Sequence, residues 1–310
     1  MFGQVLVFAD FLQHYADHGF VKAIDLNKII QAPTHYIGQK GDERIVDLVF
    51  QCPLKTSDGS LMAVIVFEHQ SSNLKAIPQK LHKYISAIWE AEAKEDKPLS
   101  APYFIVLRTG KKPYRGAYPK MSDSLPKDSD GKLIGKLVEV EYDVVDLPAW
   151  EFDKLTGGAV LRSTLMMLHT TTGGSLDNFP KALQPLLELS EGKRIDVTKE
   201  LIDFVAKAFA SNNRQLEAEM LSKALKPVLK GKEKAMIKTI FEEYADIAEA
   251  RGVVKGKAEM VLNALRTRFK RIPKNIEKTI LAMTDSIALE SLHAQAIQSG
   301  TLDEFAEGLI

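Results

Sequence analysis

The stretch from Arg44 to Ser72 constrains the fold most strongly, because it reads as two strands joined by a turn. Residues 44–52 are rich in β-branched and aromatic side chains, and residues 61–68 form an almost continuous apolar run. Between them, Asp58-Gly59 has the composition of a tight turn tip. The sequence therefore predicts a β-hairpin here.

Both predicted strands carry polar groups that an apolar strand does not need: Asp47 on the first, and Glu68 and Gln70 at the end of the second. Side chains at positions i and i+2 share a face, so Glu68 and Gln70 point the same way. If Asp58-Gly59 is a two-residue tip, Asp47 falls opposite Gln70 on that face, whereas a longer loop changes the register.

Facing carboxylates are unfavourable without a cation, and oxygen ligands of this kind suit Mg²⁺. Gln70 can polarise a water molecule or accept its hydrogen bond. These residue types therefore suit a metal site. The alternative is that the acids form a solvated strand edge or a turn cap, and spacing alone leaves both interpretations open.

The motifs in this stretch resemble those of a known family. They are R-x-x-D-L from Arg44, the D-G turn, and E-H-Q-S-S from Glu68. Together they resemble the recombination-promoting nuclease / putative transposase family, a branch of the PD-(D/E)XK nucleases, as do residues 77–90 and 251–305. The resemblance implies that Asp47 and Glu68 bind a divalent metal, Mg²⁺ or Mn²⁺. It also implies that Gln70 stands where most PD-(D/E)XK enzymes have Lys.

A helix is expected over residues 75–97, with apolar side chains on one face and Pro78 in its first turn. Its basic residues Lys80 and Lys83 follow directly after the acidic motif. The resemblance implies that they contact the DNA backbone together with Arg44. The alternative is a solvated helix face.

The rest of the N-terminal half predicts an α/β fold. Residues 1–18 have helical spacing, and Pro102–Leu107 is a buried-type strand that a helical crossover would place parallel to the second hairpin strand. A polar loop over 110–135 precedes a predicted strand over Lys136–Leu147. Together with this pattern, the resemblance implies a restriction-endonuclease-like core of the PD-(D/E)XK type, with a mixed central sheet flanked by helices.

Beyond Phe152 the pattern becomes entirely helical, with helices expected near 159–169, 178–189, 197–210, 213–229 and 233–250. We predict a nuclease-like domain over 1–190 and a helical C-terminal region over 191–310. A basic cluster near its end can contact phosphate, complement a helix dipole, or support a homo-oligomer, with helix packing the simplest interpretation. It comprises Arg266, Arg268, Lys270, Arg271 and Lys274.

Composition excludes several classes of protein. In 310 residues, 45% of them apolar, no run is long enough to span a bilayer, so we expect no membrane partner. The single cysteine, Cys52, fits a reducing cytoplasmic setting and is best read as a small buried residue. Lys+Arg and Asp+Glu both number 41, so any DNA surface must be a local patch.

Two functions follow. The first is a metal-dependent DNA endonuclease in which Asp47 and Glu68 hold Mg²⁺ at the scissile phosphate and Gln70 orients the attacking water. The second is a catalytically decayed mobile-element remnant that binds DNA or protein. The intact motif favours the first. The lack of the family's usual N-terminal H-D-x-x-F-K segment favours the second.

Overall fold

The computed structural model describes residues 2–32, 48–55, 61–70, 74–172, 178–211 and 218–309. The chain divides into two compact units, Met1–Glu233 and Lys234–Ile310. The boundary expected at residue 190 falls inside the first unit, just before helix α6 (Glu191–Ser211). None of the described helices is long and apolar enough to cross a membrane.

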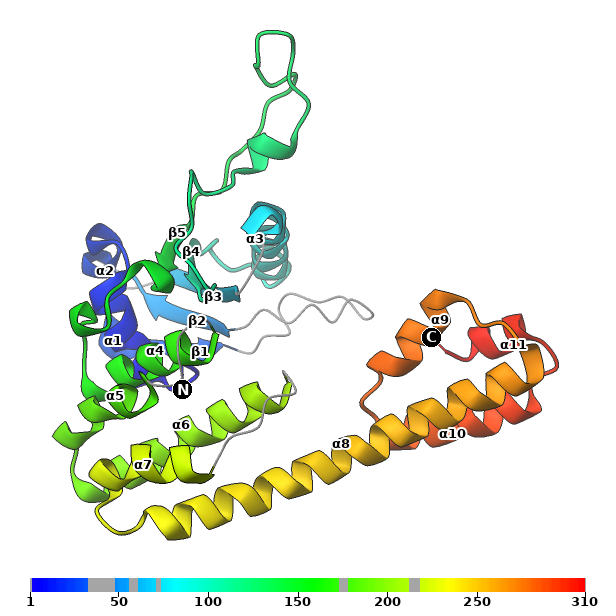
Figure 1. Cartoon of the computed structure of the whole chain (residues 1–310). Coiled ribbons are helices and arrows are strands. Elements are labelled where there is room, and N and C mark those ends of the chain that lie inside the picture. Colours follow the sequence, from blue (N-terminus) through cyan, green and yellow to red (C-terminus); the bar gives the residue numbers. More distant parts are fainter. Residues whose placement is uncertain are drawn as a thin grey trace. The chain divides into compact units, whose positions relative to one another are not determined.

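The first unit is built on a five-stranded sheet with the strands in sequence order (Figure 1). The β1–β2 and β2–β3 pairs are antiparallel, and the β3–β4 and β4–β5 pairs are parallel. The predicted mixed sheet and the parallel crossover are therefore confirmed. The strands are β1 (Ile30–Ala32), β2 (Leu48–Pro53), β3 (Met62–Gln70), β4 (Ala101–Arg108) and β5 (Asp143–Asp146).

Helix α3 (Ile77–Lys94) makes the crossover from β3 to β4 and covers one face of the sheet. Its buried residues recur at helical spacing and pack on Val64 and Val66 of β3 and on Val106 of β4. Pro78 lies in its first turn, as expected. The buried helix residues are Ile77, Pro78, Leu81, Tyr84 and Ile88.

Aromatic side chains fill the opposite face. Phe8 of helix α1 (Val5–Tyr15) stacks on Phe50 of β2 at 3.8 Å between ring centroids. Phe8 and Phe11 both meet Phe67 of β3 edge-on. Phe8, Phe11 and Phe50 are fully buried, so the predicted core-facing helix over residues 1–18 is confirmed. Since the sheet is covered on both faces, β3 reads as a continuous apolar run rather than an alternating one.

The hairpin register differs from the one that a two-residue tip requires. Leu48 pairs with Phe67, whereas a tip at Asp58-Gly59 would place Leu48 opposite His69. The observed register extends to the base of the turn, where the backbone N–H of Leu54 donates to the Leu61 carbonyl at 2.9 Å. The shift is two residues, so each side chain keeps its predicted face. The turn itself lies outside the described residues.

The strand expected over Lys136–Leu147 is shorter in the structure, where β5 covers only Asp143–Asp146. Glu139 explains the difference, because its carboxylate accepts the backbone N–H groups of Met121 and Ser122 at 2.6 and 3.2 Å. That segment therefore hydrogen-bonds to the preceding loop instead of pairing with β4. Residues 109–142 form a long excursion between β4 and β5 (Figure 1), as the polar loop over 110–135 predicted in part.

Helices complete the first unit, and they confirm that strands end before Phe152. Helix α4 (Ala159–Thr172) has an apolar side that packs into the core, where Leu161 and Leu165 are fully buried. Cys52, on β2, is also buried, and this burial raises the pKa of its thiol to about 11. The helices are α4 (Ala159–Thr172), α5 (Phe179–Leu183), α6 (Glu191–Ser211) and α7 (Ala218–Leu229), with 3₁₀ turns such as Gln184–Glu188 between them.

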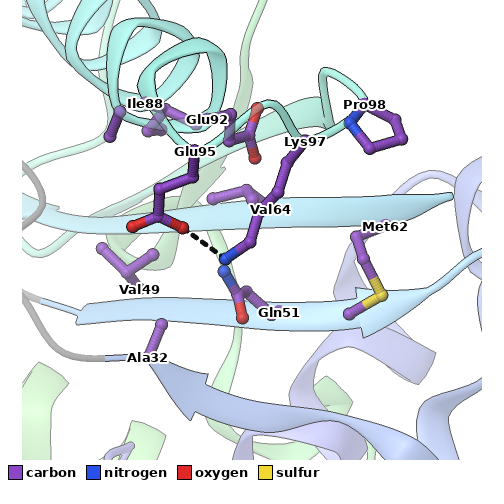
Figure 2. A pocket seen from close by; sticks show the side chains of 11 residues that line it. Ala32, Val49, Gln51, Met62, Val64, Ile88, Glu92, Glu95, Lys97 and Pro98 are labelled. Carbon is purple, nitrogen blue, oxygen red and sulfur yellow. Dashed lines mark ion pairs between the residues drawn. The ribbon is translucent and has the colours of Figure 1, made fainter.

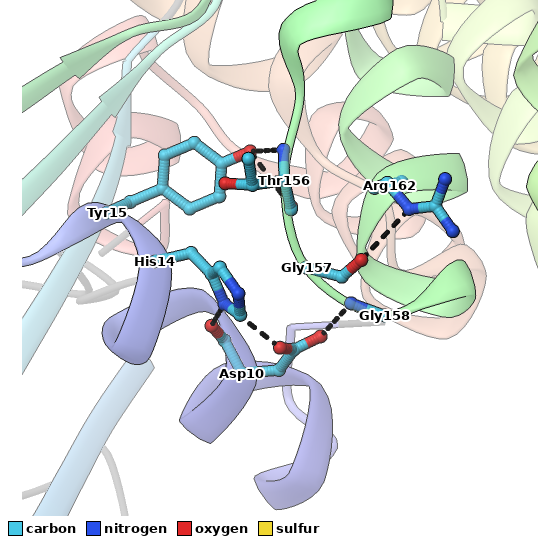
Figure 3. A network of polar contacts seen from close by, with 7 residues as sticks. All are labelled: Asp10, His14, Tyr15, Thr156, Gly157, Gly158 and Arg162. Carbon is cyan, nitrogen blue, oxygen red and sulfur yellow. Dashed lines mark hydrogen bonds and ion pairs between the residues drawn. The ribbon is translucent and has the colours of Figure 1, made fainter.

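A polar network joins α1 to the start of α4 (Figure 3). The Asp10 carboxylate accepts the Gly158 N–H at 2.8 Å and also contacts His14 Nδ1 at 3.2 Å. The Tyr15 hydroxyl accepts the Thr156 N–H at 2.9 Å and donates to the Thr156 carbonyl at 3.1 Å. Asp10 thus places a carboxylate at the N-terminus of α4, where unpaired N–H groups and the helix dipole favour negative charge.

We expect Asp10→Ala to lower the free energy of unfolding of the first unit by about 0.5–2 kcal/mol, the cost of losing a helix N-cap. Urea denaturation followed by tryptophan fluorescence measures this, because both tryptophans, Trp89 and Trp150, lie in that unit. The matched control is Asp153→Ala, which removes an exposed aspartate near the same loop. An equal midpoint for the two variants would exclude a capping role.

The second unit contains α8 (Glu233–Phe269), α9 (Lys274–Ala282), α10 (Ser286–Gln298) and α11 (Leu302–Glu307). Helix α8 is longer than the predicted 233–250, because Gly252 and Gly256 each cost only about 1 kcal/mol in a helix. Its C-terminal half packs on the other three helices around Leu265, Ile280 and Phe305.

Two residues of the predicted basic cluster make contacts inside the second unit. Arg268 donates to the carbonyl of Ala296 at 3.0 Å and to that of Ile297, at the C-terminus of α10. Arg266 pairs with Glu277 at 2.5 Å. These contacts confirm helix packing, and Arg268 complements the α10 dipole as one of the alternatives proposed.

Candidate functional site

The candidate site lies where the parallel strands β3, β4 and β5 end. The last residues of these strands form one row, with Gln70 paired to Arg108 and Arg108 paired to Asp146. Glu68 lies two residues before Gln70, on the face of the sheet that α3 covers. Ligands of α/β proteins commonly bind outside the carboxyl ends of parallel strands, so the position is suited to a functional group.

Glu68 is a buried carboxylate, with only 3% of the residue exposed. The Lys80 ammonium donates to Glu68 Oε1 at 2.6 Å, and the Tyr84 hydroxyl donates to Oε2 at 3.4 Å. Lys80 and Tyr84 are one helical turn apart on α3, so one helix face supplies both partners. A buried carboxylate requires such a cation, because desolvating an uncompensated charge is costly.

The structure describes only some of the other predicted site residues. Lys83 is exposed on α3, one residue before Tyr84, so its ammonium is available to an anionic ligand. Gln70 is partly buried at the last position of β3 and shares the face of Glu68, as the pleat predicted. Asp47 and Arg44 lie outside the described residues, so their roles stay predictions.

An ion pair that the sequence interpretation did not include lies in the same row. Arg108 Nη1 donates to Asp146 Oδ1, and these residues are only 8% and 6% exposed. Asp146 Oδ2 also accepts the backbone N–H of Tyr114 at 2.6 Å. A charged residue at the end of an apolar strand was the signal that marked Glu68. The same signal occurs at the ends of β4 and β5 and could have identified this pair.

Two tyrosines of the excursion, Tyr114 and Tyr118, lie beside this pair, and a third, Tyr142, lies next to them. The rings of Tyr114 and Tyr118 stack with centroids 5.3 Å apart, and the Arg108 guanidinium lies 5.6 Å from the Tyr114 centroid. The Tyr142 hydroxyl donates to the Pro119 carbonyl at 2.7 Å, next to Tyr118. Burial raises the pKa of Tyr118, with the Asp146 charge acting in the same direction. Burial also raises the pKa of Tyr142, to about 12.

Two cavities lie in the first unit, and Glu68 lines neither of them. The first, of about 230 Å³, lies between α3 and the sheet (Figure 2). Met62 and Val64 of β3 line it, at the opposite end of that strand from Glu68, and Glu95 pairs with Lys97 at its rim at 2.5 Å. It is therefore separate from the candidate site.

The second cavity, of about 280 Å³, is mainly apolar and lies on the other face of β3. His69 lines it, and a ring nitrogen, Nε2, lies 2.8 Å from the Thr109 hydroxyl. His69 belongs to the E-H-Q-S-S motif, yet its side chain points away from Glu68 because successive strand residues alternate between faces. Within the described ranges, no group of three or more His, Cys, Asp or Glu side chains is arranged to hold a metal ion.

Comparison with known proteins adds the family. A family model described as "Putative transposase, YhgA-like" matches residues 1–197, which include the whole sheet, α3 and the excursion. No curated protein matches the chain significantly. No solved structure matches it either. The matched residues make up more than half of the chain and include the motif from Glu68 to Ser72 and the row of strand ends around it. The chain therefore belongs to the YhgA-like family of putative transposases.

Proposed function

We propose that this protein is a metal-dependent DNA endonuclease with a PD-(D/E)XK type of site at the ends of the parallel strands. The observation that carries the proposal is Glu68, a buried carboxylate at the end of an apolar strand within a family of transposases. Such families act on DNA phosphodiester bonds, and paired carboxylates suit that chemistry.

Asp47 is the proposed second carboxylate. Leu48 pairs with Phe67 across the hairpin, and the two acids are their sequence neighbours, Asp47 before Leu48 and Glu68 after Phe67. Asp47 itself lies outside the described residues, so its contribution rests on the family motif and on this neighbouring pair.

Two properties of Glu68 support the proposal of a hard divalent cation. Glu68 offers carboxylate oxygens, the ligands that Mg²⁺ and Mn²⁺ prefer. Its charge is matched by a cation, Lys80, whose side chain is 36% exposed and so has room to move. We propose that Asp47 and Glu68 hold the metal, which when bound lowers the pKa of a water molecule and neutralises charge on the phosphate.

Other side chains would then position the water, the Glu68 carboxylate and the DNA backbone. Gln70 orients the attacking water by hydrogen bonding, in the place where a lysine would act by its charge as well. Tyr84 fixes the Glu68 carboxylate by a hydrogen bond from a rigid helix. Lys80, Lys83 and Arg44 contact the DNA backbone, with Lys80 exchanging its Glu68 contact for phosphate.

The test is nicking of supercoiled plasmid with Mg²⁺ or Mn²⁺, comparing the wild-type protein with Asp47→Ala. We expect the wild type to nick, and we expect both the variant and added EDTA to reduce the rate at least about 100-fold, because a lost metal ligand costs several kcal/mol in the transition state. Equal nicking by both proteins would point to a different site or a contaminant. A folded protein that binds DNA without nicking would support the decayed binding remnant instead.

A further inference from the structure

The segment Lys111–Lys120 combines basic and aromatic residues at the edge of the sheet where Glu68 lies. Its sequence, KKPYRGAYPK, contains four basic residues and no acidic one. Lys111, Lys112, Arg115 and Lys120 are all exposed, and none of them forms an ion pair within the described part of the chain. A surface of this composition suits a polyanion that also carries flat rings, which is the chemistry of a nucleic acid strand.

We propose that the stacked rings of Tyr114 and Tyr118 form a platform for an unpaired base of single-stranded DNA. The platform lies beside the carboxyl ends of β3, β4 and β5, near Glu68. Tyr114 is the inner ring, because it packs against the apolar core under α3. Tyr118 is the outer ring, and 37% of it is exposed to solvent. An exposed ring stacked on a fixed one offers its free face to a base at little further cost in entropy.

The platform is held at both of its ends. Asp146 accepts the Tyr114 N–H at 2.6 Å, and Tyr142 donates to the Pro119 carbonyl at 2.7 Å. The Arg108 guanidinium lies over Tyr114, on the side of the sheet edge. The segment is therefore fixed to the ends of β4 and β5, although it belongs to a long excursion (Figure 1).

This position connects the platform to the proposed chemistry. Arg108 and Asp146, which hold the platform, share a row with Gln70, two residues from Glu68. A strand whose phosphate lies at Glu68 would thus have neighbouring nucleotides near the tyrosines, where stacking requires that the base is unpaired. The inference rests on the proposed function and deepens it, because it names the substrate class as DNA with a single-stranded segment.

The experiment is fluorescence anisotropy in EDTA, with a labelled oligodeoxynucleotide as a single strand and as a duplex. EDTA removes the metal, so this assay measures DNA binding without cleavage. The platform proposal can therefore fail here while the nicking test succeeds, and the reverse. We expect Tyr118→Leu to weaken single-strand binding by about 5- to 150-fold, the usual effect of one lost base stack, and duplex binding by less than about twofold. Tyr118→Phe keeps the ring and should bind like the wild type.

Ile134→Ala is the matched control, because it removes an exposed apolar side chain, 70% accessible, from the same excursion. It should change neither affinity. Equal losses for single strand and duplex in Tyr118→Leu would overturn the platform, as would unchanged single-strand binding or a wild type that does not bind single strands. Circular dichroism of each variant shows that it is folded, and Tyr118→Phe supplies the contrast if Tyr118→Leu is not.

Discussion

Glu68→Gln should reduce metal-dependent plasmid nicking at least about 100-fold while leaving the protein folded, because several kcal/mol of transition-state stabilisation depend on a metal ligand. The substitution is close to isosteric and keeps an acceptor for the Tyr84 hydroxyl. Lys80 loses its partner, but its side chain is 36% exposed and can reach water. A loss of activity without loss of folding would assign a chemical role to this carboxylate.

The control for this variant is Glu90→Gln, which makes the same change on α3. Glu90 is exposed and pairs only with Lys94, one turn along the same helix, among the described residues. It should nick like the wild type. Calorimetric titration of Mn²⁺ provides a second readout, since Glu68→Gln should weaken metal binding and Glu90→Gln should not. Nicking by Glu68→Gln within about threefold of the wild type would exclude Glu68 as a metal ligand.

Arg108→Met should be the most destabilising single change at the strand ends, lowering the free energy of unfolding by about 3–5 kcal/mol. The cause is Asp146, whose side chain is only 7% exposed and would be left buried without its cationic partner. The Tyr114 N–H still donates to Asp146, which places the expected value towards the lower end of that range. Urea denaturation followed by the fluorescence of Trp89 and Trp150 measures the change in the first unit alone.

Two comparisons separate a buried charge from lost packing. Adding Asp146→Asn to Arg108→Met removes the charge but keeps an oxygen for the Tyr114 N–H, so the double variant should be more stable than Arg108→Met. Lys94→Met breaks an exposed ion pair on α3 and should change the midpoint far less. If Arg108→Met cost no more than Lys94→Met, the Arg108–Asp146 pair would not contribute to stability.

Glu68→Gln and Arg108→Met test activity and stability, respectively, at the carboxyl ends of the parallel strands. Glu68 is compensated by a lysine from α3 whose side chain is 36% exposed, so an anionic ligand can reach this cation. Asp146 is compensated by an arginine whose side chain is 10% exposed and fixed in the row of strand ends. Two buried carboxylates of the same edge thus differ in how their charge is balanced, and this difference separates a group suited to binding from one suited to structure.

The sequence by itself determined the main strands of the sheet and the polar groups at the end of β3. The apolar run over residues 61–68 required a buried strand, and the side-chain alternation placed Glu68 and Gln70 on one face. The apolar spacing in α3 likewise required that helix to cover the sheet. These predictions succeeded because each depends on a periodicity within one segment.

The tertiary structure decided everything that depends on contacts between distant segments. The hairpin register was fixed only by the pairing of β2 with β3, and the late start of β5 followed from Glu139 binding the backbone at Met121 and Ser122. The pairing of Lys80 with Glu68 and of Arg108 with Asp146 likewise joins residues 12 and 38 positions apart. No periodicity encodes such pairs. The first arises when α3 packs on β3, and the second when the β4–β5 register brings two strand ends side by side.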